Sequence, residues 1–183
     1  YNVLSAVATL LLLGIELERL RIGLSSLPSL PGRLERYTLA NGAQAFIDYA
    51  HTPASFQAIF ATVRPWTDNL IVVFGAGGGK DTLKRPLMGA MAAQWADHIV
   101  LTSDNPRYED VEVIIDQIKG GIQSCYTQKL VIEKDRARAL ERAYALSTKD
   151  SIIMVLGKGP DESEEINGQV IPFEEKKILL SLR

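Results

Sequence analysis

The chain has 183 residues, of which 46% are hydrophobic and 23% are charged, and its formal net charge is -2 at pH 7. This length suits one domain with a complete core plus a fragment of a second domain. The small net charge and the lack of any lysine/arginine cluster exclude a nucleic-acid surface and a polybasic membrane patch. With one cysteine and two histidines, the sequence predicts no disulfide, no protein-built metal site and a cytoplasmic setting.

The first segment of the chain is apolar over residues 3–15. It is too short to span about 30 Å of hydrocarbon, and it lacks the basic flank and cleavage site of a signal peptide. Asn2 as a cap and Gly14 as a stop predict a helix over 2–13, and an amphipathic helix follows over 16–27. The turn-rich stretch 28–32 predicts a domain boundary that divides the chain into 1–31 and 32–183. Because no Met begins the chain, we expect it to start inside a larger protein.

Beyond this boundary, short apolar runs alternate with helical patterns. Strands are predicted at 45–49, 70–74, 97–102, 129–132 and 151–156, and helices near 53–63, 86–95, 111–122 and 136–147. Several of these strands are apolar on both faces, which is typical of a parallel sheet covered by helices on two sides. A hairpin over 165–173 and a last helix to 182 complete the chain. The predicted fold is therefore α/β, with a doubly wound, mostly parallel, Rossmann-like sheet after two helices of an upstream domain.

Polar and glycine-rich loops follow four of the predicted strands, at 48–53, 75–81, 104–107 and 157–162. Ligands of such sheets bind outside the carboxyl ends of the strands, where these loops meet. The string 104–107 reads Asp-Asn-Pro-Arg, which combines an acceptor, an amide, a rigid turn and a planar fork that matches a carboxylate. It predicts a ligand with an ammonium and a carboxylate, such as an amino acid. The alternative is a helix-entry turn with Asp or Asn as its cap.

The glycine loop fits neither of the standard nucleotide motifs. Phe74 stands where a P-loop needs its first glycine, and Lys80 stands where a dinucleotide fingerprint needs its last. The loop still offers main-chain amides, with Lys80 at its tip and Lys84 and Arg85 close behind. These groups suit an anion, either phosphate or carboxylate. A tight strand-to-helix turn is the alternative.

Two further groups of residues end strands of the predicted sheet. Asp48 lies in an otherwise buried strand, and because an unpartnered buried carboxylate is unfavourable, we expect it to contact a ligand group such as a ribose hydroxyl. A single histidine is more often structural, so we assign no base to His51. The loop 157–159 brings amides and a cation to the edge, and Asp161 and Glu162 would supply negative charge for an ammonium.

Taken together, these motifs resemble the Mur ligase family over nearly the whole chain, and more closely its branch that adds the third peptide residue of the peptidoglycan precursor. The similar segments are Asn2, 31–33, 48–53, 75–81 with 84–89, 104–107 and 157–159. The resemblance implies an ATP- and Mg²⁺-dependent ligase that adds meso-diaminopimelate to UDP-MurNAc-L-Ala-D-Glu. In this family an acyl phosphate forms first, and an amino group then attacks it to make the amide bond. Residues 32–183 would be its C-terminal amino-acid-binding domain, and 1–31 the last helices of its central ATPase domain.

The resemblance also implies roles for individual residues. The amino-acid site would comprise Lys80, Asp104, Asn105, Pro106, Arg107, Gly157 and Asp161. The nucleotide side would comprise Asn2, Arg33, Asp48 and His51. No catalytic or metal-binding residue is assigned, because the family's P-loop and Mg²⁺ ligands lie upstream. We therefore expect this fragment to be inactive alone, and to bind neither nucleic acid nor a membrane.

Two positions depart from the family pattern. Lys80 stands where arginine is usual, which keeps the charge but loses the fork, and Asp161 stands where glutamate is usual. Arg107 favours diaminopimelate over lysine, because lysine would leave a buried guanidinium unpaired. The alternatives are a lysine-adding or other Mur-type ligase and a noncatalytic amino-acid-binding module. A nicotinamide-dependent dehydrogenase fails on the missing fingerprint.

Overall fold

The structure is a computed structural model that describes residues 2–182. It divides the chain into two units, Tyr1–Leu30 and Pro31–Arg183, one residue from the predicted boundary. The first unit contains α1 (Asn2–Leu12) and α2 (Leu17–Ser25), which are one to two residues shorter at their ends than predicted. α1 begins at Asn2 itself, and the side chain of Asn2 lies outside the described part. Among the described residues, no helix is long and apolar enough to cross a membrane.

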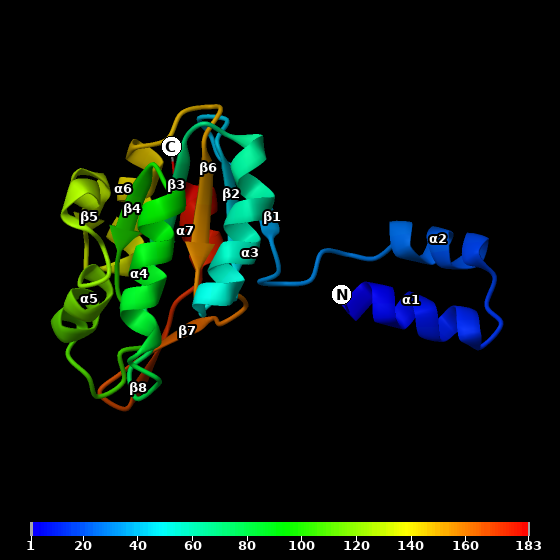
Figure 1. Ribbon diagram of the computed structural model, residues 1–183, viewed down its shortest axis with the longest axis horizontal. Helices are drawn as coiled ribbons and strands as arrows, with labels where there is room; N and C mark the ends of the chain where they lie inside the picture. Colours follow the sequence, from blue (N-terminus) through cyan, green and yellow to red (C-terminus); the bar gives the residue numbers. More distant parts are fainter. Residues whose placement is uncertain (1, 183) are drawn as a thin grey trace. The chain divides into compact units, whose positions relative to one another are not determined.

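The second unit is built on a six-stranded sheet with the strand order β1-β2-β6-β3-β4-β5 (Figure 1). The parallel strands are β2 (Gln44–Asp48), β3 (Leu70–Phe74), β4 (His98–Leu101), β5 (Leu130–Ile132) and β6 (Ile152–Leu156). They confirm the predicted doubly wound, mostly parallel sheet. The sequence did not predict the antiparallel edge strand β1 (Glu35–Thr38). Its side chains alternate only between partly buried and exposed, so β1 lacks the apolar run that marks the other strands.

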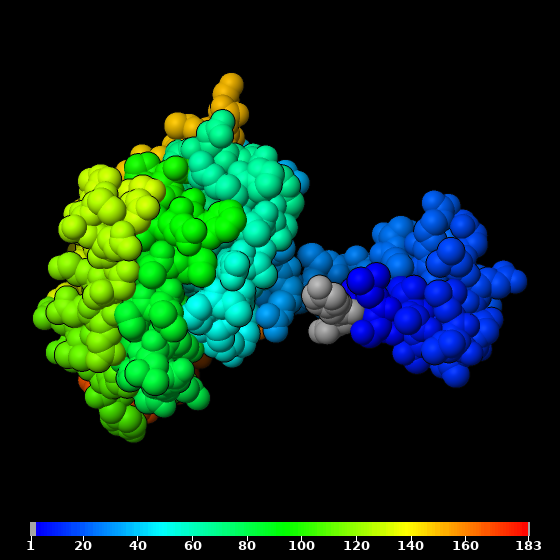
Figure 2. Space-filling model, viewed as in Figure 1, coloured from blue at the N-terminus to red at the C-terminus, as the bar shows by residue number. Residues whose placement is uncertain are grey.

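Helices cover both faces of this sheet. On one face lie α3 (Pro53–Val63), α4 (Lys84–Trp95) and α5 (Val111–Lys119), which form the outer surface seen in Figure 2. On the other face lie α6 (Arg136–Ala145) and α7 (Glu175–Ser181). β3 and β6 are buried along their whole length, as expected for central strands between two helical layers. Short 3₁₀ helices, η1 (Arg64–Trp66) and η2 (Ser124–Lys129), follow α3 and precede β5.

A small hairpin lies at the carboxyl edge of the sheet, toward which the β6 arrow points in Figure 1. It consists of β7 (Ser163–Ile166) and β8 (Gln169–Pro172) and turns at Asn167 and Gly168, as predicted. Both turn residues have positive φ, 50° and 75°, which an Asn-Gly turn accommodates readily. A single bridge joins Ile166 to Arg107. The hairpin is therefore a wall beside the loop that follows β4.

Candidate functional site

A cavity of about 340 Å³ lies at the carboxyl edge of the sheet, where the loops after β2, β3, β4 and β6 meet. It is lined by Tyr49, His51, Gly77, Lys80, Asp81, Lys84, Asp104, Asn105, Arg107, Gly157 and Asp161. The structure thus brings together every residue predicted for the amino-acid site except Pro106. It also brings His51, which was predicted for the nucleotide side.

Glycines let the loops around this cavity touch one another. A Cβ on Gly157 would lie 2.3 Å from Asp104 Oδ2, and a Cβ on Gly78 would lie 1.9 Å from the carbonyl oxygen of Pro106. At Gly78 the close atom belongs to the backbone, so a side chain would force the two loops apart, and at Gly157 a φ of +109° adds strain for any other residue. Pro106 is buried, and its carbonyl packs against Gly78. Pro106 therefore shapes the junction of two loops and does not line the cavity.

Asp104 provides the cavity with a carboxylate that accepts no hydrogen bond from the described residues. Within the described residues no donor hydrogen-bonds to this carboxylate, and Lys158 Nζ lies 4.0 Å from its Oδ1. Burial raises the pKa of Asp104, and the charges of Arg136 and Lys158 only partly oppose that effect. A carboxylate in this position is an acceptor for a cationic ligand group such as an ammonium.

Asn105 is held so that its amide nitrogen remains available. Its Oδ1 accepts from Lys158 Nζ at 3.1 Å and from the backbone N–H of Glu165 at 2.9 Å. Lys158 also donates to the carbonyl of Ser163 at 2.8 Å, and its side chain is fully buried. Burial lowers the pKa of Lys158. The sequence suggested Lys158 as a cation at the edge of the site; the structure instead makes it a buried support for Asn105.

Arg107 is held by the glycine loop and the hairpin together. Its Nη1 donates to the carbonyl of Gly78 at 2.8 Å, and its Nε lies 3.0 Å from Glu165 Oε2. Its main chain bonds to the carbonyl of Glu165 and to the amide of Asn167, at 2.9 and 2.6 Å. In the described structure, Nη2 has no hydrogen-bond partner, so this end of the fork is free for a carboxylate.

The loop around Asn105 and Arg107 has a strained backbone. Both residues have positive φ, 44° and 54°, a region that non-glycine residues rarely adopt. Such strain costs on the order of 1–3 kcal/mol per residue and persists only where the surroundings hold it. Here the hairpin does so through its bonds to Asn105 and Arg107. The hairpin thus fixes the conformation of the loop that carries the predicted specificity residues.

Two fully buried arginines support the loops from below. Arg136 donates to the carbonyls of Ser103 and Leu156, both at 2.9 Å, and pairs with Glu175 at 2.6 Å. Arg85 donates to the carbonyl of Gly77 at 3.0 Å and pairs with Glu109 at 2.7 Å. The sequence placed Arg85 near an anion; the structure shows that it is a support instead.

Sequence reasoning missed Arg136 and Glu175 altogether. A usable signal was present, because Arg136 stands on the same helical face as Ala139, Leu140 and Ala143, at spacings of three, four and seven. A charged residue on an apolar stripe needs a buried partner.

The cations and acids at the mouth of the cavity are less constrained. Lys80, Asp81 and Asp161 are exposed, whereas Lys84 is half-buried and burial lowers its pKa. Glu162, the predicted substitute for Asp161, does not line the cavity. Of these two acids, only Asp161 lines the cavity.

Three of the four residues predicted for the nucleotide side lie close together in the second unit, where Arg33 and His51 both contact the ring of Tyr49, the neighbour of Asp48. Asp48 is buried, and its carboxylate accepts from the amides of Leu34 and Ala50, both at 2.8 Å, so our reason for expecting a ligand there was wrong. Arg33 lies over the ring of Tyr49, 5.4 Å from its centroid, outside the cavity lining. Asn2 belongs to the other unit, and its side chain lies outside the described residues.

The chain thus contains a doubly wound α/β domain whose carboxyl edge carries an acid, an amide and a guanidinium, and comparison with known proteins defines its class. Residues 32–159 match the family model described as the Mur ligase, glutamate ligase domain, and the chain belongs to the Mur ligase family. This confirms the resemblance seen in the sequence.

Within the Mur ligase family, two of the similar curated proteins share one name. The chain is 36% identical over 184 residues to the UDP-N-acetylmuramoyl-L-alanyl-D-glutamate--2,6-diaminopimelate ligase of Cytophaga hutchinsonii, covering 100% of this chain and 38% of that protein. It is 41% identical over 180 residues to the ligase of the same name from Caldanaerobacter subterraneus, covering 98% and 37%. The chain therefore spans less than two fifths of the length of these curated relatives.

Solved structures agree on the fold. A structure of a UDP-N-acetylmuramoyl-L-alanyl-D-glutamate--2,6-diaminopimelate ligase superposes with a TM-score of 0.75 at 31% identity, covering 96% of this chain and 36% of that one. A pseudomurein peptide ligase type C from Methanothermus fervidus superposes with a TM-score of 0.64 at 21% identity, covering 86% and 32%. At that identity the second likeness supports the fold alone.

Proposed function

We propose that this chain is the amino-acid-binding part of an ATP-dependent ligase that adds meso-diaminopimelate to UDP-MurNAc-L-Ala-D-Glu in peptidoglycan precursor synthesis. The observation that carries the proposal is a cavity holding both the unbonded carboxylate of Asp104 and the open end of the Arg107 guanidinium. The similarity to diaminopimelate ligases supports it. Diaminopimelate carries an ammonium and a carboxylate at each end, which are the groups that this pair of side chains recognises.

Five of the lining residues have a role in binding the amino acid. Asp104, with Asp161, accepts hydrogen bonds from an ammonium of the ligand. Arg107 binds the distal carboxylate through its free Nη2, and the amide nitrogen of Asn105 donates to the same ligand. Lys80 adds a second positive charge at the mouth. Because lysine has no distal carboxylate, it would leave the Nη2 end of Arg107 without a partner, although Nε stays paired with Glu165. A site that offers a hydrogen-bonding group discriminates against a ligand that lacks the matching group.

ATP, when bound, supplies the energy for amide formation by activating the acyl group. Within the described residues, no group of three or more His, Cys, Asp or Glu side chains could hold a metal ion. Tyr49, with Arg33 over its ring and His51 against its edge, fits a contact with part of a nucleotide. We propose that most of the ATP and Mg²⁺ site, and the contact with UDP-MurNAc-dipeptide, lie in the part of the ligase that this chain does not cover.

The contribution of this chain to the reaction is then positional. Asp104, Asn105 and Arg107 hold the amino acid at a fixed distance from the sheet edge, and the loops are rigid because the hairpin and two buried arginines hold them. Closure of this domain over an ATPase domain would bring the held amino group to the activated acyl group. The isolated chain should therefore bind the amino acid without turning over ATP.

An NMR titration tests the proposal. The ¹⁵N-labelled chain is titrated with meso-diaminopimelate and, separately, with L-lysine. We expect shifts at residues 104–107 and 157–161 with diaminopimelate only. Arg107→Ala should remove this preference, whereas Arg138→Ala, a change at an exposed arginine of α6, should keep it.

Other outcomes point to the alternatives. Equal responses to both amino acids would contradict the selectivity and favour a lysine-adding or less specific ligase. Turnover of ATP by the isolated chain would contradict its role as a binding part only. Absence of shifts with either amino acid would contradict a preformed amino-acid site in this chain.

A further inference from the structure

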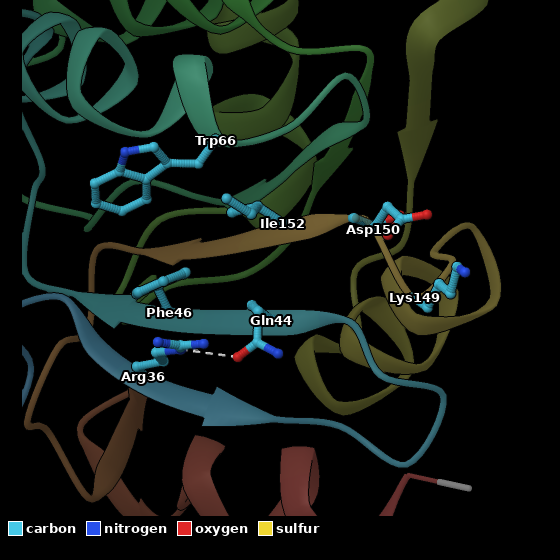
Figure 3. A pocket seen from close by; sticks show the side chains of 8 residues that line it. Arg36, Gln44, Phe46, Trp66, Lys149, Asp150 and Ile152 are labelled. Carbon is cyan, nitrogen blue, oxygen red and sulfur yellow. Dashed lines mark hydrogen bonds between the residues drawn. The ribbon is translucent and has the colours of Figure 1, made fainter.

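A second hollow lies at the opposite edge of the sheet, where β2 and β6 begin (Figure 3). Its volume is about 560 Å³, compared with about 340 Å³ for the cavity at the carboxyl edge. It is lined by Arg36, Gln44, Phe46, Trp66, Lys149, Asp150, Ser151 and Ile152. None of these residues lines the amino-acid cavity, so the hollow is a separate feature of the fold.

The hollow exists because the edge strand β1 is left uncovered on this face of the sheet. Arg36 is paired with Phe46 across β1 and β2, and both side chains lie on the α3 side of the sheet. Phe46 is buried, but Arg36 is exposed. Arg36 and Phe46 thus form the floor of the hollow. η1 ends at Trp66 beside this floor, so the indole forms a wall of the hollow.

The wall and floor present aromatic rings at one end of the hollow. Trp66 is 57% exposed, which is a large exposure for an indole beside the domain core. Its ring lies 6.2 Å from that of Phe46, centroid to centroid, at a tilt of 45°. In Figure 3 the labelled side chains of Trp66, Phe46 and Arg36 gather at this end, with Lys149 and Asp150 at the other. An open indole face of this kind suits a second flat ring.

Arg36 is fixed in place beside these rings. Its Nε donates to Gln44 Oε1 at 2.9 Å, and the hydroxyl of Thr38 donates to the same oxygen at 3.0 Å. Gln44 is itself anchored, because its Nε2 donates to the carbonyl of Gly42 at 3.2 Å. Over the described chain, the two Nη atoms of Arg36 have no hydrogen-bond partner and no carboxylate within 4.0 Å. The outer edge of the guanidinium is therefore free to bind an anion bidentately.

The remaining charges strengthen this preference. Lys149 adds a second cation, and it too has no carboxylate within 4.0 Å among the residues described. Asp150 is the single acid of the lining. With two cations and one acid, the hollow favours a negatively charged ligand over a neutral or positive one.

We propose that this hollow binds a small planar aromatic anion, with the ring against Trp66 and the carboxylate or phosphate on Arg36. The volume lies within the range of about 300–1,000 Å³ that is usual for small-molecule sites. The site is independent of the amino-acid cavity, because the two hollows share no residue and lie at opposite edges of the sheet.

An NMR titration tests this proposal with three probes, which separate the contribution of the aromatic ring from that of the anionic group. The ¹⁵N-labelled chain is titrated with 1-naphthoate, with neutral 1-naphthalenemethanol and with cyclohexanecarboxylate, which has the anion without the ring. We expect saturable shifts with 1-naphthoate at the Trp66 indole N–H, the Gln44 side-chain amide and the backbone of Phe46. The Trp95 indole N–H and residues 104–107 should not move, and meso-diaminopimelate should not compete.

Variants decide whether the two named side chains carry the binding. Arg36→Gln and Trp66→Leu should each weaken 1-naphthoate binding about tenfold or more, whereas Arg138→Gln, at another exposed arginine, should leave it unchanged. Because Arg36 is exposed and Trp66 is 57% exposed, the signals of residues away from the hollow should keep their positions in both variants, and unfolding should remain cooperative.

Three results would overturn the proposal. Equal binding of the neutral naphthyl probe would show an apolar docking surface instead of an anion site. Unchanged binding by Arg36→Gln, or shifts confined to residues 104–107, would place the anion elsewhere. Absence of saturable shifts up to about 10 mM 1-naphthoate would exclude a preformed site of this class.

Discussion

The two buried arginines hold the same cavity from opposite faces of the sheet, and they do so with different partners. Arg136, the first residue of α6, bonds to the last main-chain carbonyls before the loops that carry Asp104 and Gly157. Arg85, near the start of α4, bonds to the glycine loop at Gly77. Each arginine therefore fixes main-chain atoms directly beneath a loop of the site.

Their partners differ in exposure to water. The side chain of Glu175, which pairs with Arg136, is 2% exposed, whereas that of Glu109, which pairs with Arg85, is 33% exposed. Burial raises the pKa of Glu175, although the charge of Arg136 opposes this, while the bond from Arg85 lowers the pKa of Glu109. The predicted specificity loop thus depends on a desolvated ion pair, and the glycine loop on a partly hydrated one.

The largest expected difference follows from removing each arginine in turn. Arg136→Met should lower the free energy of unfolding by about 3–5 kcal/mol, because it leaves the Glu175 carboxylate buried without its partner. Arg85→Met should cost about 1–3 kcal/mol, because Glu109 can be hydrated when its partner is lost. Urea unfolding at neutral pH measures both values.

A double variant separates the ion pair from the packing around it. Replacing both partners, in Arg136→Met with Glu175→Leu, should recover much of the lost stability, since apolar residues of similar volume often replace a buried pair without loss. Equal losses for Arg85→Met and Arg136→Met, or no recovery in the double variant, would contradict the difference between the two supports.

The loop that Arg136 supports carries Asp104, whose ionisation should make ligand binding depend on pH. Its raised pKa means that the affinity for meso-diaminopimelate should increase as pH rises through that pKa, because only the ionised carboxylate accepts fully from an ammonium. Asp104→Asn should weaken binding at neutral pH by about 10–100-fold and flatten the acid limb of the profile. Calorimetric titration over about pH 4–8 measures this.

The same residue has an opposite effect on stability. Because the folded state holds the Asp104 proton more tightly than the unfolded chain does, this contribution is present below the ordinary pKa of 3.8 and is lost as pH rises through the raised value. Asp104→Asn should therefore be no less stable than the parent at neutral pH while it binds more weakly. Loss of both stability and affinity would show that Asp104 is a structural residue.

The contact between the glycine loop and the loop after β4 can be tested at two adjacent glycines. In Gly78→Ala the new Cβ would meet the carbonyl of Pro106 at 1.9 Å, so backbone must move, at about 1–3 kcal/mol. Gly79→Ala is a matched control, because it has nothing within 4 Å and is penalised only by its φ of +64°, at about 1 kcal/mol. The amide signals of residues 104–107 should shift in the first variant and stay in the second. Similar spectra for the two would mean that the loops do not touch.

Much of this fold could be predicted because the signals were local. β3 and β6 are continuous apolar runs, and Thr52 and Pro53 mark the start of α3, where a capping box forms with Ser55. β1 could not be predicted, because its stability comes from pairing with β2 and not from its own short, half-polar sequence.

The site also has features that could be predicted from local sequence and features that could not. The loops at the carboxyl ends were predictable, because parallel strands bring their ends to one edge. The partners of buried charges were not, since they come from distant segments: Asp48 is bonded by the amide of Leu34, and Arg136 by Glu175 in the last helix. The burial of Lys158 likewise depends on the hairpin, which covers it only in the folded chain.

The smallest expected effect is the change in ligand affinity when Lys80, at the tip of the glycine loop, is replaced. Lys80 lines the cavity and is exposed, so its ammonium gives a carboxylate a point charge, whereas an arginine there would offer a bidentate fork. Lys80→Arg should tighten meso-diaminopimelate by about two- to fivefold, since exposed ion pairs contribute less than about 1 kcal/mol. Calorimetric titration with L-lysine is the control, because lysine has one carboxylate fewer and should gain less. An equal gain for both amino acids would mean that Lys80 contacts the carboxylate that they share, and that Arg107 alone selects the distal one.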